Sequence, residues 1–190
     1  MARQRVGQRA AQPRAPYRGP GWKQLPTLGV DVGGVIVTLA GRDADTSFFG
    51  TRPLATPAVD GVFEALALLT ADPFAGRVHI VSKAGPKVAA NTRAWLAHHD
   101  FHTRTGIPAA NVHFVRERRD KAPVCARLGI THFIDDHLDV LAHLDSVDHR
   151  YLFLGGTTAP APRQPLPPWA TAATLWTDLA EVLRASGRGE

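Results

Sequence analysis

Residues 28–37 read LGVDVGGVIV, an apolar run interrupted by one carboxylate and two consecutive glycines. The apolar, β-branched residues at its start predict a short buried strand over residues 27–32. Asp31 stands at the end of this strand, and Gly33 and Gly34 follow where the chain has to turn. Glycine allows a sharp turn and leaves room for a close approach to the backbone. The stretch therefore predicts a strand that ends at a functional site.

Downstream of this stretch, short apolar strands alternate with segments of helical periodicity. We predict strands over residues 77–82, 111–115, 131–134 and 151–154, and helices over 58–70, 85–98, 121–128, 137–144 and 177–185. This alternation is typical of an α/β three-layer sandwich, a Rossmannoid fold in which helices cover both faces of a mostly parallel sheet. We expect the core to span residues 27–190.

Charge and cysteine content limit the class of protein. The 190 residues are 44% hydrophobic, which suits a folded domain, and the single cysteine fits a reducing, cytoplasmic setting. No apolar run approaches the ~20 residues of a membrane span.

The positive charge is concentrated at the N-terminus. The chain carries +5 in total and residues 1–26 carry +6, so the remainder carries −1. We expect residues 1–26 to be a disordered basic arm, either a solvated tail or a weak contact for nucleic acid.

Polar side chains stand where the predicted strands end. Asp31 ends the first strand and Ser82 the second, and Asp135 and Asp136 follow a later one. Lys121 begins the helix that precedes that later strand. The carboxyl ends of parallel strands share one edge of a sheet, where ligands bind in such folds. The sequence thus predicts that these side chains converge.

The order of these residues resembles the motif order of the haloacid dehalogenase (HAD) superfamily of hydrolases. Its first motif, an apolar strand followed by Asp-x-Asp-Gly, matches VDVGGVIV around Asp31. Its second motif matches VHIVSKAG around Ser82, its lysine matches Lys121 in RRDKAPVCARLG, and its acidic motif matches THFIDDHLDV. The resemblance covers roughly residues 27–155.

The resemblance implies phosphoryl transfer through an aspartate nucleophile. Asp31 would attack phosphorus and form an aspartyl-phosphate, which water then hydrolyses. Ser82 and Lys121 would be catalytic and bind the phosphate, together with the backbone at Gly34. The implied cofactor is Mg²⁺, held by Asp31, the carbonyl of Gly33 and Asp136, with Asp135 in support.

One position departs from the motif of phosphatases in this superfamily. Gly33 occupies the place of a second aspartate, the general acid and base, whose contribution is typically ~10²–10⁴ in rate. Three interpretations remain open. In the first, the protein is a phosphatase whose leaving group needs no proton or takes one from another residue, of which His137 is the nearest in sequence. In the second, it hydrolyses carbon–halogen or phosphorus–carbon bonds, and in the third it is a degenerate member that binds a phosphorylated ligand or nucleic acid.

The gaps between motifs are too short for a large cap domain. Residues 38–57 would form at most a flap or small lid, and the proline-rich stretch at 155–169 a long loop at the rim. The expected partner is a phosphorylated small molecule or a nucleotide-like substrate, with no membrane involved.

Overall fold

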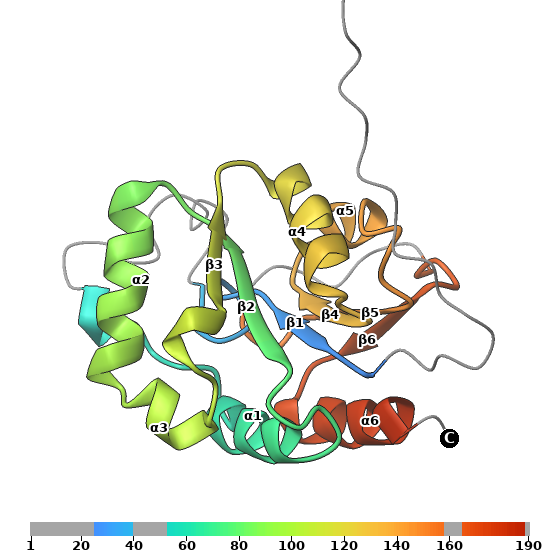
Figure 1. Ribbon diagram of the computed structural model, residues 1–190, viewed down its shortest axis with the longest axis horizontal. Coiled ribbons are helices and arrows are strands. Elements are labelled where there is room, and N and C mark those ends of the chain that lie inside the picture. The colour runs from blue at the N-terminus through green and yellow to red at the C-terminus, as the bar shows by residue number, and fades with distance from the viewer. Residues whose placement is uncertain (1–24, 40–52, 158–164, 189–190) are drawn as a thin grey trace, which may run out of the picture.

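The computed structural model describes residues 25–39, 53–157 and 165–188. Its six strands form one sheet in the order β3-β2-β1-β4-β5-β6, in which every neighbouring pair is parallel (Figure 1). The strands are β1 (Leu28–Val30), β2 (Val78–Lys83), β3 (Val112–Val115), β4 (His132–Asp135), β5 (His149–Phe153) and β6 (Ala170–Ala173). The first strand therefore lies inside the sheet, between β2 and β4.

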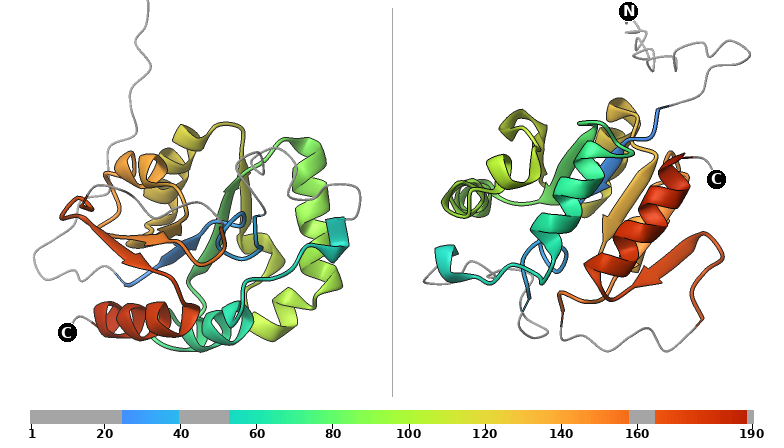
Figure 2. Two further views of the ribbon diagram at one scale, coloured as in Figure 1. Left: turned by 180° about the vertical axis from the view of Figure 1, so that it is seen from behind. Right: turned by 90° about the horizontal axis from the view of Figure 1, so that it is seen from below.

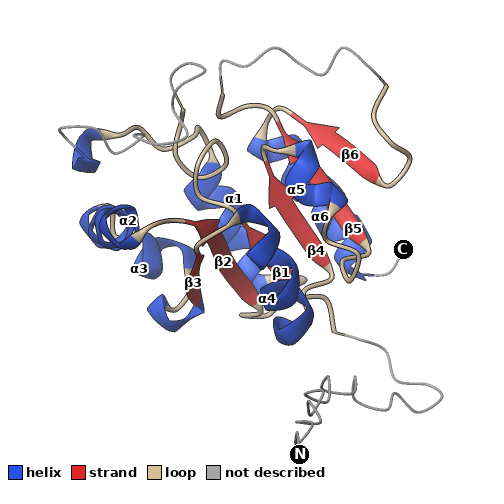
Figure 3. Ribbon diagram, turned by 90° about the horizontal axis from the view of Figure 1, so that it is seen from above, coloured by secondary structure: helices blue, strands red, loops and turns tan. Residues whose placement is uncertain are grey.

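Helices cover both faces of this sheet. They are α1 (Val62–Ala71), α2 (Pro86–His98), α3 (Phe101–Thr105), α4 (Lys121–Leu128), α5 (Leu138–Ala142) and α6 (Trp176–Arg188), with 3-10 turns η2 (Pro53–Ala55), η3 (Ala109–Asn111) and η4 (Arg118–Asp120). α1 and α6 lie side by side on one face (Figure 2), and α4 and α5 lie on the other (Figure 3). The result is a three-layer α/β sandwich.

Apolar periodicity explains how the helices attach to the sheet. In α6 the buried residues Trp176, Leu179, Ala180 and Leu183 recur at helical spacing, so one stripe faces the core. α4 ends at Gly129, whose φ of 65° is the left-handed conformation common after a helix. One cluster of buried residues lies beneath α1, α2 and α6, and a second lies beneath α4 and α5.

The strand register brings three strand ends to the same level. Val30 pairs with Ile80 on one side and with Ile134 on the other. The backbone N–H of Asp31 continues this pairing by donating to the carbonyl of Ile134 at 3.0 Å. The residues that follow Val30, Ile80 and Ile134 therefore share one edge of the sheet, as the sequence predicted.

The predicted fold class is confirmed, and no cap domain is inserted in the connections that the structure describes. The sequence did not predict β6 and α3. β6 is an edge strand of small residues with weak β preference, and α3 is too short to show a period. The described residues include no helix long and apolar enough to cross a membrane.

Several predicted segments fall largely outside the described residues. These are most of the basic arm at 1–26, the centre of the flap at 38–57 and part of the loop at 155–169. The described ends of the flap are joined, because the N–H of Thr38 donates to the carbonyl of Pro57 at 3.0 Å and Val37 bridges Ala58.

Candidate functional site

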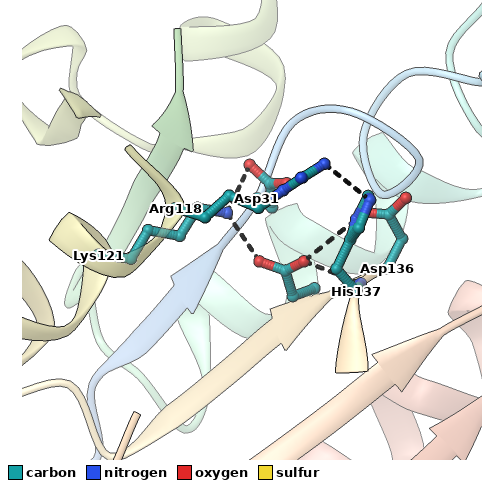
Figure 4. A network of polar contacts seen from close by, with 6 residues as sticks. Asp31, Arg118, Lys121, Asp136 and His137 are labelled. Atoms are coloured by element: carbon teal, nitrogen blue, oxygen red, sulfur yellow. Dashed lines mark hydrogen bonds and ion pairs between the residues drawn. The ribbon is translucent and has the colours of Figure 1, made fainter. Parts of the chain in front are cut away.

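A buried ion-pair cluster lies at the carboxyl end of β1 and β4 (Figure 4). The ammonium Nζ of Lys121, the first residue of α4, lies 3.1 Å from Oδ1 of Asp31 and 2.7 Å from Oδ2 of Asp135. Lys121 and Asp135 are 1% and 0% exposed, and Asp31 is 8% exposed. Three residues that are distant in sequence thus meet at one point, as predicted.

Burial and ion pairing act in opposite directions on Lys121. Burial alone would lower the pKa of its ammonium, but the carboxylates of Asp135 and Asp31 reverse this effect and raise the pKa above its usual value. The lysine is therefore held in its charged form. Its contact with Asp31 lacks hydrogen-bond geometry, so Oδ1 of Asp31 is a buried carboxylate oxygen to which no described residue donates a hydrogen bond.

Asp135 and Asp136 occupy different positions although they are adjacent. Asp135 accepts hydrogen bonds from Lys121 and, through Oδ1, from the backbone N–H of His137 at 2.9 Å. Asp136 instead contacts the His137 ring, at 2.7 Å from Nδ1. Burial raises the pKa of both carboxyl groups, and the nearby charge of Asp31 adds to the rise.

A chain of polar contacts extends from Asp136 to the surface. Nη2 of Arg118, in η4, lies 2.9 Å from Nε2 of His137, and Figure 4 shows the arginine side chain extending to this ring. A guanidinium only donates, so Nε2 of His137 accepts and its Nδ1–H donates to Asp136. The pKa of His137 is raised by Asp136, with burial and Arg118 acting against the rise. The sequence pointed to His137 but not to its contact with Arg118, since neither residue lies in a periodic element.

The second glycine after β1, Gly34, is required by packing against Asp136. Gly34 has a φ of +69°, and a Cβ added there would lie 2.5 Å from Oδ2 of Asp136 and 2.8 Å from Cγ2 of Thr157. A Cβ on Gly156 would in turn collide with the carbonyl oxygen of Gly34. The turn after β1 is therefore packed between the ends of β4 and β5, and its close approach to Asp136 is met only by glycine.

These residues fit a divalent cation. Asp135, Asp136 and His137 offer ligand atoms that lie within 4.8 Å of one another. The carboxylates of Asp31 and Asp135 both contact the single ammonium of Lys121, and the nearby carboxyl group of Asp136 adds to the acidic character of the site. One buried oxygen of Asp31 accepts no hydrogen bond from any described residue. Carboxylate and carbonyl oxygens are the ligands that Mg²⁺ prefers.

Two predicted site residues, Ser82 and Gly33, have no contact with this cluster among the described residues, and Gly33 instead bridges Val37. Ser82 lies near the end of β2 and is 6% exposed, and its hydroxyl makes no hydrogen bond to any described residue. It is not the N-cap of the following helix either, because Gly85 occupies that position before α2. A role for Ser82 in binding phosphate stays a prediction.

Comparison with known proteins assigns the fold. No protein-family model and no curated protein sequence matches this chain. Among solved structures, a HAD family hydrolase from Deinococcus radiodurans, with phosphate and sodium bound, is similar with a TM-score of 0.56. The similarity covers 86% of this chain and 97% of the other, at 14% sequence identity. The chain has a HAD-like α/β fold, and at this identity the similarity establishes the fold alone.

Proposed function

We propose that this protein is a HAD-type phosphohydrolase that transfers a phosphoryl group to Asp31 and then to water. The observation that carries the proposal is the buried contact of Asp31 and Asp135 with Lys121 at the carboxyl edge of a HAD-like sheet. The similar hydrolase was solved with phosphate bound, which supports a phosphorylated substrate for this chain as well.

The chemistry follows from the positions of these side chains. A carboxylate oxygen of Asp31 forms a bond to phosphorus as the bond from phosphorus to the leaving oxygen breaks, which gives an aspartyl-phosphate. Water then attacks this phosphorus, releases inorganic phosphate and restores the Asp31 carboxylate. Lys121 offsets the negative charge that gathers when a phosphate approaches the carboxylate of Asp31.

Mg²⁺ would be held by Asp31, Asp136 and the backbone carbonyl of Gly33. Asp135 would support this site, because its carboxylate is fixed by hydrogen bonds from Lys121 and from the backbone N–H of His137. When bound, the ion neutralises charge between the nucleophile and the phosphate. Gly34 contributes by leaving space beside Asp136, which the side chain of any other residue would fill.

The absence of a carboxylate at Gly33 narrows the substrate class. The ring of His137, the nearest alternative source of a proton, contacts Asp136 through one nitrogen and Arg118 through the other. In this arrangement neither nitrogen is available to protonate a leaving group. The geometry therefore favours acyl or phenolic phosphates, whose leaving groups depart without a proton.

Two phosphorylated compounds, an acyl phosphate and a phenolic phosphate, test the proposal. We expect Mg²⁺-dependent release of phosphate from acetyl phosphate and p-nitrophenyl phosphate, and its loss in Asp31→Asn. Asp145→Asn, which changes an exposed aspartate in the same way, is the matched control. Equal rates in the wild type and Asp31→Asn would reject the assignment. The other two interpretations predict no phosphate release from either compound. A hydrolase of carbon–halogen or phosphorus–carbon bonds would instead hydrolyse haloacids or phosphonates, and a degenerate member would bind its ligand without any hydrolysis.

A further inference from the structure

A pocket of about 420 Å³ opens beside the candidate site, between η4 and α5. It is lined by Lys83 at the end of β2, by Arg118 and Arg119 of η4, and by Asp139 and His143 around α5, among other residues. This volume falls within the ~300–1,000 Å³ typical of small-molecule sites. None of the catalytic roles proposed above uses Lys83, Arg119 or His143.

The pocket faces the same side of the sheet as Asp31. Side chains alternate along a strand, so Lys83 points to the face of Val81, which packs beneath α4 and α5. Lys121, which contacts Asp31, comes from α4 on that same face. Arg118 belongs to both places, since it lines the pocket and contacts His137 beside Asp136. A molecule at Asp31 can therefore extend into the pocket past Arg118.

Positive charge dominates the polar lining. Lys83, Arg118 and Arg119 contribute three fixed cations against the carboxylates of Glu117 and Asp139. The carboxylate of Glu117 is engaged, because it accepts the backbone N–H of Asp120 in a capping box. Among the residues that the structure describes, neither Lys83 nor Arg119 has an ion-pair partner, so both cations are available to a ligand.

His143 adds a hydrogen-bond acceptor to this wall. Its Nδ1 lies 2.6 Å from the carbonyl oxygen of Asp139. A carbonyl only accepts, so Nδ1 carries the proton and, in the neutral ring, Nε2 accepts a hydrogen bond from a ligand. The pocket thus presents two cations without ion-pair partners and a ring acceptor, which together suit an anionic group with a neighbouring hydroxyl.

We propose that this pocket binds a second anionic group of the substrate, a carboxylate or a further phosphate, while the scissile phosphate lies at Asp31. The proposal rests on the proposed function and adds the substrate class to it. A phenolic or acyl phosphate that also carries a carboxylate or a second phosphate has the required chemistry, whereas a phosphate compound without a second anion leaves Lys83 and Arg119 without an anionic partner.

A graded series of compounds tests the proposal by binding and by turnover. Phenyl phosphate has no second anion, p-carboxyphenyl phosphate adds a carboxylate, and the bisphosphate of hydroquinone adds a second phosphate. Titration calorimetry with Asp31→Asn and Mg²⁺ measures binding without turnover, and phosphate release by the wild type gives kcat/KM. We expect p-carboxyphenyl phosphate and the hydroquinone bisphosphate to exceed phenyl phosphate at least about tenfold in both measurements, the effect of one charge-assisted hydrogen bond.

Two exposed arginines, one just before α4 and one in its last turn, provide matched variants. Arg119 lies in the pocket, whereas Arg127 lies at the far end of the helix. We expect Arg119→Gln and Lys83→Gln to reduce the preference for the second anion about tenfold, and Arg127→Gln to retain it. Equal values across the three compounds, or equal effects of Arg119→Gln and Arg127→Gln, would overturn the proposal. If phosphate is released but the second anion has no effect, the pocket proposal is rejected and the phosphohydrolase proposal stands. If compounds with a second anion bind more tightly but no phosphate is released, the phosphohydrolase proposal is rejected and the pocket is retained.

Discussion

Lys121 and Asp31 form an ion pair at 3.1 Å in which both groups are almost wholly removed from solvent. The same ammonium contacts Asp135 at 2.7 Å, so one cation compensates two buried carboxylates. Removing one partner from a buried pair is far more costly than removing an exposed charge, because it leaves the other charge uncompensated. The lysine is therefore the electrostatic centre of the candidate site.

Lys121→Met should lower the free energy of unfolding by about 3–5 kcal/mol, since it leaves Asp31 and Asp135 buried without their cation. Urea denaturation measures this loss. Arg127→Met, an exposed position in the same helix, is the control and should change stability little. A Lys121→Met protein as stable as the control would show that the ion pair has no net stabilising role.

Gly34→Ala should damage the site beyond its effect on stability. Gly34 has a φ of +69°, and an added Cβ would lie 2.5 Å from the carboxylate oxygen of Asp136. Gly76 has a φ of +78° with nothing within 4 Å of an added Cβ, so Gly76→Ala carries the conformational cost alone, about 1–2 kcal/mol. We expect Gly76→Ala to lose this much stability in urea titrations and Gly34→Ala to lose more, together with the proposed phosphatase activity and the response to Mg²⁺. Equal behaviour of the two variants would contradict a packing role for Gly34.

The sequence was informative where strand order and strand ends determine position. Asp31 and Asp135 each follow a buried apolar strand, and the parallel sheet places both strand ends at one edge without further information. Lys121 was predictable because it begins a helix beside that edge. The contact between Arg118 and His137 was not, since it joins a short turn to a strand–helix connection whose relative positions depend on tertiary packing.

Other features were missed for the same physical reason. β6 consists of small residues that pair only because β5 is already in place, and the pocket depends on how η4 is held above α5. For Ser82 the sequence predicted the position but not the direction of the side chain. The residue lies near the end of β2 as predicted, but side chains alternate along the strand, so its hydroxyl lies on the opposite face from Val81 and Lys121.

Mg²⁺ should stabilise the folded protein, because the site proposed for it exists only when the strand ends converge. A ligand at about 100 times its Kd adds about 2.7 kcal/mol to the free energy of unfolding. We expect a rise in melting temperature with Mg²⁺ that is absent in Asp136→Asn and retained in Asp148→Asn, an exposed control. A shift of the same size in both variants would place the ion elsewhere.

Acid should destabilise the protein partly through His132. This ring is 3% exposed, its Nε2 has no hydrogen-bond partner among the described residues, and burial, with a smaller effect of His149, lowers its pKa from 6.5 to about 4. The unfolded chain therefore binds the proton more readily, so this stabilisation is complete above pH 6.5 and is lost as the pH falls toward 4.

The lowered pKa corresponds to about 3 kcal/mol at neutral pH. Urea titrations of the wild type and His132→Phe between pH 7 and pH 4 measure it, and the variant should show the smaller decline in stability across this range. The ring of the variant can still stack on that of His149, which lies 4.3 Å from His132 between ring centroids. Parallel declines would show that His132 titrates normally in the folded protein.

Restoring the missing acid tests why Gly33 stands beside the nucleophile. Gly33→Asp places a carboxyl group two residues beyond Asp31, where it can protonate an alkoxide leaving group and then activate water. We expect hydrolysis of alkyl phosphates to rise by about 10²-fold or more, while acetyl phosphate, whose leaving group needs no proton, changes little. Gly33→Asn has nearly the same shape without the acid and should show no such gain. If Gly33→Asn hydrolyses alkyl phosphates as fast as Gly33→Asp, the effect of the substitution is steric. If the wild type already hydrolyses alkyl phosphates rapidly, another group supplies the proton.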